Sequence, residues 1–163
     1  MGLFGIGKKA IAAEILGNNA MAVMLNADDC WGDVCLLRSY QTADSIATCE
    51  MAFARAALVQ RTLTQGQEQA VADRIVVSAN KFVVDAFATQ DNAETVKFYR
   101  APMRDVALER VKFYDQNAFP ISQLAATIGA ALGVPGIPSV EAAFLFEKVE
   151  TRVREITGKY KVV

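Results

Sequence analysis

The chain has 163 residues, of which 53% are hydrophobic and 21% are charged, and its formal net charge is -1. This length suits one domain with a sizeable core, and the near-neutral charge excludes a bulk electrostatic attraction to nucleic acid. Histidine is absent, which excludes Ser-His and Cys-His nucleophiles and the histidine-bearing zinc and di-iron patterns. We therefore expect a single domain over residues 1–163 that binds no cofactor and is not an enzyme.

The first seventeen residues have the apolar spacing of an amphipathic helix, with two lysines near the edge of its apolar face. We expect this helix to pack on the rest of the domain or to be swapped into a partner subunit. The alternative is that residues 1–17 detach and lie on a membrane surface. No apolar run here is long enough to span a membrane. The candidate interaction residues are Leu3, Phe4, Ile11 and Ile15.

Residues 18–41 fit two structures. One is a pair of short helices around an acidic turn, and the other is a β-hairpin with MAVML and VCLLR as its strands. We favour the helices, because Ala, Met and Leu are weak strand formers.

A local carboxylate cluster, Asp28, Asp29 and Asp33, supplies the candidate metal ligands of this segment. Carboxylate oxygens are ligands for Mg²⁺ and Ca²⁺, but the spacing does not match the EF-hand loop. A turn with helix-capping aspartates is the interpretation that we favour. The three cysteines have no zinc-like or CxxC spacing, which predicts reduced thiols in a cytoplasmic protein.

The central element of the chain is an alanine-rich stretch from Thr42 to Leu63. Alanine is the best helix former, and Gly66 follows as a C-terminal stop, so we predict one helix with apolar groups on opposed faces. A second helix is predicted over residues 67–88, where the runs IVV and FVV recur seven residues apart, a helical and not a strand repeat. The short loop TQGQ makes the two helices an antiparallel hairpin.

Three further helices are predicted in the remaining sequence. Asp91 is expected to cap the first of them, with Glu94 completing a capping box, and Pro102 either kinks this helix or separates it from another. Its basic residues are read as a solvated face, diluted by acidic ones. The segment SQLAATIGAAL and a last helix from Ser139 to about Thr157 follow, and the final valines pack back or dock on a neighbouring subunit.

These elements predict an all-α, single-domain bundle of about five to seven helices around the hairpin of residues 42–88. The leading functional hypothesis is a non-enzymatic interaction or assembly protein, oligomeric, whose partner is itself or another protein. Its basis is the close-packing alanine-rich helices, the high apolar content and the apolar termini. The alternatives are a small-ligand or metal-binding bundle and a peripheral membrane protein that uses its N-terminal helix.

Overall fold

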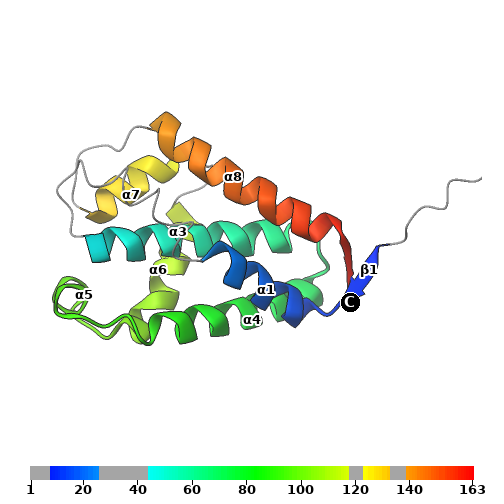
Figure 1. The fold of residues 1–163 in the computed structure, drawn as a ribbon, viewed down its shortest axis with the longest axis horizontal. Coiled ribbons are helices and arrows are strands. Elements are labelled where there is room, and N and C mark those ends of the chain that lie inside the picture. The colour runs from blue at the N-terminus through cyan, green and yellow to red at the C-terminus, as the bar shows by residue number, and fades with distance from the viewer. Residues whose placement is uncertain (1–7, 26–43, 118–122, 133–138) are drawn as a thin grey trace, which may run out of the picture.

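The computed structural model describes residues 8–25, 44–117, 123–132 and 139–163. In these residues the protein is an all-α bundle, as predicted, and it also has one small parallel sheet that was not predicted (Figure 1). The elements are β1 (Lys9–Ile11), α1 (Ala13–Met24), α3 (Asp44–Thr64), α4 (Gln69–Phe87), α5 (Ala93–Tyr99), α6 (Met103–Asn117), α7 (Leu124–Leu132), α8 (Ser139–Gly158) and β2 (Tyr160–Val162).

Helix α3 is the centre of the bundle. It lies between α8 on one side and α4 on the other (Figure 1), and it contacts all six of the other described helices. Every residue from Met51 to Val59 is buried, so the helix is enclosed around its whole circumference over this stretch. The alanines that predicted the helix also allow this enclosure, because small side chains let neighbouring helices approach from several directions.

The predicted hairpin of α3 and α4 is confirmed, and the two helices run in opposite directions (Figure 1). Gly66 lies in the connecting turn with a φ of 76°, a left-handed conformation that favours glycine. The IVV and FVV runs both lie within α4, so they are helical and not strands. Between the helices, the side chain of Gln60 donates a hydrogen bond to Asn80 at 2.6 Å, and the rings of Phe53 and Phe87 pack 4.5 Å apart.

Helix α1 packs most extensively on α4, and a glycine makes their close approach possible. A Cβ built at Gly17 would lie 2.8 Å from the backbone carbonyl oxygen of Ile75. Near this crossing, Glu14 forms an ion pair with Arg74, and its backbone carbonyl accepts a hydrogen bond from Ser78 at 2.6 Å. The orientation of α1 on α4 is therefore fixed by both packing and polar contacts.

The N-terminal segment differs from its prediction as one amphipathic helix. Residues Lys9–Ile11 form strand β1, which pairs in parallel with β2, and the helix begins only at Ala13. The cause is non-local, because the backbone partners of β1 lie at the other end of the chain. The prediction that the final valines pack back is confirmed: Ile11 lies opposite Val162, and the amide of Val163 donates to the Ile11 carbonyl.

The prediction for residues 18–41 can be tested only in its first part. Residues 18–24 belong to α1, so MAVML is helical up to Met24 and the hairpin alternative is wrong for this stretch. VCLLR lies outside the described residues.

Pro102 separates two helices, which decides between the alternatives of a kink and a break. Arg100 ends α5 in a left-handed conformation, with a φ of 57°, and α6 begins at Met103. The capping residue of α5 is Asn92 and not Asp91, and Thr95 takes the reciprocal place predicted for Glu94. Asp91 caps α6 instead, because its side chain accepts a hydrogen bond from the Met103 amide at 2.7 Å.

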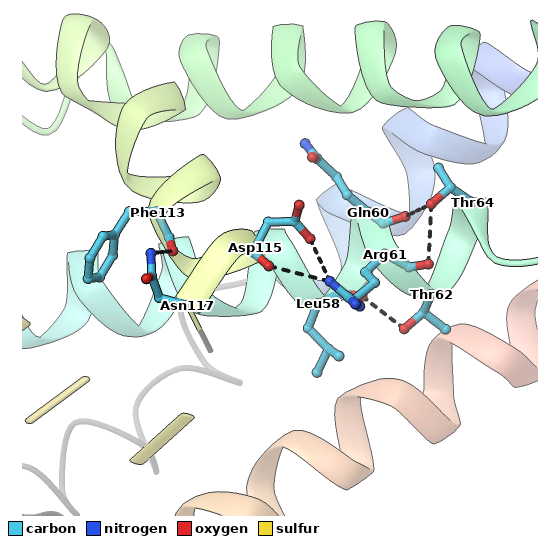
Figure 2. A network of polar contacts seen from close by, with 8 residues as sticks. All are labelled: Leu58, Gln60, Arg61, Thr62, Thr64, Phe113, Asp115 and Asn117. Atoms are coloured by element: carbon cyan, nitrogen blue, oxygen red, sulfur yellow. Dashed lines mark hydrogen bonds and ion pairs between the residues drawn. The ribbon is translucent and has the colours of Figure 1, made fainter. Parts of the chain in front are cut away.

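A polar contact joins the C-terminal halves of α3 and α6 (Figure 2). The guanidinium of Arg61 lies 3.3 Å from both the carboxylate and the backbone carbonyl of Asp115. Next to it on α3, Thr62 and Thr64 donate hydrogen bonds back to the carbonyls of Leu58 and Gln60 (Figure 2), so their hydroxyl groups are satisfied within the helix.

Candidate functional site

The sequence-predicted site residues fall in three places. Ile15 lies on α1 with 53% of its surface exposed, whereas Ile11 lies in β1 and is partly buried. The other predicted residues, Leu3, Phe4, Asp28, Asp29 and Asp33, lie outside the described residues. Of the predicted interaction residues, Ile15 is therefore described and exposed. The prediction of metal ligands at Asp28, Asp29 and Asp33 is not tested.

Ile15 stands on the edge of a surface groove between α1 and α4. The groove has a volume of about 660 Å³ and is open to solvent along its length. Helix α1 contributes the wall with Ile15 and two asparagines, and α4 contributes the wall with Val77 and Phe82. Gly17, which allows α1 and α4 to pack closely, lies on the same helix as the α1 wall of this groove.

Val77 is the most exposed large apolar residue in the described part of the chain, with 69% of its surface accessible. Together with Ile15 it places two branched aliphatic side chains at one groove, on two different helices. Single exposed apolar residues are ordinary on protein surfaces, but neighbouring ones at a concave site are typical of a docking surface. We call this surface, made by Ile15, Val77, Ser78, Lys81 and Phe82, the α1–α4 face.

Charged groups border the α1–α4 face on both sides. The Glu14–Arg74 ion pair stands at one end, with 2.6 Å between a carboxylate oxygen and the Nε atom. Its hydrogen bond from Arg74 lowers the pKa of Glu14 below the usual value for glutamate. Lys81 and Asp85 line the groove on α4, so the border carries both signs of charge. A mixed border of this kind surrounds the apolar centre of many protein interfaces.

Sequence reasoning found Ile15 but missed Val77, although a signal for it was present. Arg74 and Lys81 mark the polar side of α4, and Val77 lies three residues after the first and four before the second. That spacing places all three on one side of a helix. The position of Val77 between two basic residues on the polar side of α4 therefore indicated that it is exposed.

A buried polar cluster lies elsewhere, between α3, α5 and α6. The carboxylate of Glu50 is fully buried and accepts hydrogen bonds from both Tyr99, at 2.6 Å, and Tyr114. Arg110 binds the same carboxylate through Nε at 3.1 Å and through Nη2. Burial of Arg110 opposes its charge, but the hydrogen bond and charge of Glu50 outweigh this and raise its pKa. All four polar side chains thus satisfy one another.

The surroundings of this cluster favour the protonated forms of Tyr99, Tyr114 and Cys49. Burial, and then the negative charge of Glu50, raise the pKa values of Tyr99 and Tyr114 above the usual value for tyrosine. Burial also raises the pKa of the neighbouring Cys49 to about 12. A thiol that stays protonated at neutral pH is a poor nucleophile, so we assign the cluster a structural role.

The cluster also borders a smaller groove of about 430 Å³. The side chains that line it include Tyr99, Arg110 and two carboxylates of α6, Asp105 and Glu109. These carboxylates oppose the binding of an anion to Arg110, whose charge is already balanced by Glu50. This groove therefore indicates the chemistry of a ligand less clearly than the α1–α4 face does.

Within residues 8–25, 44–117, 123–132 and 139–163, no group of three potential metal-ligating side chains occurs. None of the helices described there combines the length and apolar character that a membrane span requires. Comparisons of this chain with protein-family models, with curated proteins and with solved structures gave no match.

Proposed function

We propose that this protein is a non-enzymatic interaction or assembly protein of the cytoplasm, which binds a protein partner through the α1–α4 face. The observation that supports this proposal is the joint exposure of Ile15 and Val77 at one groove. Burying such side chains contributes about 1.5–3 kcal/mol each when the burial is complete. Two of them at the centre of an interface can therefore supply the apolar anchor that a partner needs.

The shape of the face favours a helical partner segment. A groove between two packed helices accepts the apolar side of a third helix, whose side chains at positions i, i+3, i+4 and i+7 enter it. Asn18 and Asn19 on α1 and Ser78 on α4 line the same groove and offer hydrogen bonds around the apolar centre. This combination resembles the polar rim and apolar core of known interfaces.

The two helices are also held in place before any partner binds. Gly17 contacts the backbone of Ile75, and Arg74 and Ser78 both bind Glu14. A face that is already ordered loses little conformational entropy on binding, which leaves more of the burial energy for affinity.

The membrane alternative has a weaker geometric basis. It required Ile11 and Ile15 on one face of one helix, but Ile11 lies in β1 and Ile15 in α1. The small-ligand and metal alternative remains a prediction for Asp28, Asp29 and Asp33.

Site-specific photocrosslinking tests the proposed function. A benzophenone amino acid at position 77 should give one discrete covalent adduct in cells, identified by mass spectrometry of the crosslinked peptides. The same group at Leu108, a partly exposed apolar residue of α6, serves as the control and should give no such adduct. Equal, diffuse labelling from both positions would contradict docking at the α1–α4 face.

A further inference from the structure

The exposed side of α4 has a pattern that is symmetric about Val77. Four residues before it stands Asp73 and four residues after it stands Lys81, so opposite charges flank Val77 on either side of one face. Seven residues before and after it are Ala70 and Val84, which continue the apolar line of Val77 along the helix. The stripe therefore carries a negative charge about one turn before Val77 and a positive charge about one turn after it.

Neither flanking charge is neutralised in the described structure. Lys81 has no ion pair there, and the contact found for Asp73 is a hydrogen bond from the Gln69 side chain at 2.7 Å. Both residues are exposed. They cannot pair with each other, because eight residues of α-helix separate them by about 12 Å along the axis. Within the part of the chain that the structure describes, neither charge is in an ion pair, so both are available to another molecule.

A second copy of α4 matches this pattern when it lies antiparallel. With a two-fold axis at Val77, each residue before position 77 lies level with the residue the same distance after it in the other copy. Asp73 then lies level with Lys81 of the second copy, and Lys81 with its Asp73. Ala70 lies level with Val84 in the same way. Two ion pairs thus flank the contact between the two Val77 side chains, and the contacts of Ala70 with Val84 lie beyond them, as in an isologous interface.

The nearest alternative arrangements of the two helices lose these ion pairs or bring like charges together. A parallel pair places Lys81 next to Lys81 and Asp73 next to Asp73. An antiparallel pair displaced by one residue in one direction places Arg74 level with Lys81, and displacement in the other direction leaves Asp73 and Lys81 without an opposite charge. Like charges at such positions are unfavourable, so the sequence of α4 selects against these alternatives.

We propose that the partner at the α1–α4 face is a second copy of this chain, bound through antiparallel α4 helices about a two-fold axis at Val77. This inference rests on the proposed function and names its partner. Helix α4 has 19 residues, a length of about 28 Å. Because the contact is confined to one helix of that length, we expect a concentration-dependent dimer and not a permanent one.

Two charge variants that should restore the dimer when they are mixed test the register of the two α4 helices. In Lys81→Asp, two aspartates face each other in each pair, and in Asp73→Lys two lysines do. Each variant alone should sediment as a monomer at concentrations where the wild type is a dimer, with a dissociation constant raised about tenfold or more. An equal mixture of the two variants should restore the dimer, because every pair then joins Asp to Lys. The double variant should also dimerise alone.

Sedimentation velocity from about 1 µM to about 1 mM protein measures these states, and circular dichroism confirms that each variant keeps its helix content. Glu155→Lys, on exposed α8, is the matched charge control and should leave the dimer unchanged. A wild type that stays monomeric, or a mixture that fails to dimerise while the wild type does, overturns the proposed partner or register. If the adduct at position 77 is then another polypeptide, the proposed function stands and only the identity of its partner changes.

Discussion

The buried carboxylate of Glu50 is bound by the guanidinium of Arg110, sixty residues further along the chain. Two tyrosine hydroxyl groups bind the same carboxylate, so one side chain joins α3 to both α5 and α6. A buried ion pair is weak evidence for net stability, because desolvating both charges offsets their attraction. Its arrangement still helps to specify how three helices meet, because Arg110, Tyr99 and Tyr114 share one buried acceptor.

Removing Glu50 should therefore be severely destabilising. We expect Glu50→Ala to lower the free energy of unfolding by about 3–5 kcal/mol, because Arg110 and two tyrosine hydroxyls are left without their acceptor. Glu50→Gln, which keeps the shape and one acceptor, should have a smaller effect. Urea unfolding followed by circular dichroism measures both. Glu155→Ala, on the exposed surface of α8, should stay within about 0.5 kcal/mol of the wild type. A similarly small change in Glu50→Ala would show that the cluster does not hold the helices together.

The same cluster predicts a loss of stability at alkaline pH. The folded protein holds Cys49, Tyr99 and Tyr114 in their protonated forms, with pKa values raised above the ordinary values of 9.0 for cysteine and 10.0 for tyrosine. The unfolded chain releases these protons first, so their contribution is complete below pH 9 and decreases as the pH rises, for Cys49 until its folded pKa of about 12.

Urea unfolding at a series of pH values from about 7 to about 11 measures this loss. Tyr99→Phe removes one of the two phenols and should make the alkaline decrease shallower. The prediction would be wrong if the wild type were as stable at the alkaline end of the series as at neutral pH.

The crossing of α1 and α4 predicts a strong effect of a single methyl group. Gly17→Ala places a Cβ 2.8 Å from the Ile75 carbonyl oxygen, so the helices must separate. We expect a loss of about 1–3 kcal/mol in thermal or urea unfolding, although alanine is the better helix former. Gly158→Ala is the control, since no atom lies within 4 Å of its added Cβ. If the two variants unfold alike, α1 does not pack on α4 as described.

The helices were predictable from the sequence where the information is local. The alanine content of α3 and the seven-residue repeat of α4 each lie within one element, so the predicted ranges 42–63 and 67–88 differ from the structure only at their ends. The caps were less predictable, because neighbouring polar residues compete for them. Asn92 takes the cap assigned to Asp91, while Glu94 accepts a hydrogen bond from Ser45 of α3 instead of closing a capping box.

The non-local features had no local signal. Glu50 and Arg110 each look like an ordinary charged helix residue, and only the packing of α3 against α6 shows that they meet. The strand β1 was missed for the same reason, because its partner strand β2 lies at the other end of the sequence. At the candidate site, Ile15 was found by its helical spacing. The exposure of Val77 was indicated only by its place between Arg74 and Lys81 on the polar side of α4, and this indication was missed.

The pairing of β1 with β2 has a consequence for how the protein is made. Ile11 finds its hydrogen-bond partner only at Val163, so this contact cannot form until the ribosome has released nearly the whole described chain. Helix α1 follows β1 directly, so this late contact fastens the N-terminal end of α1 to the residues that follow α8.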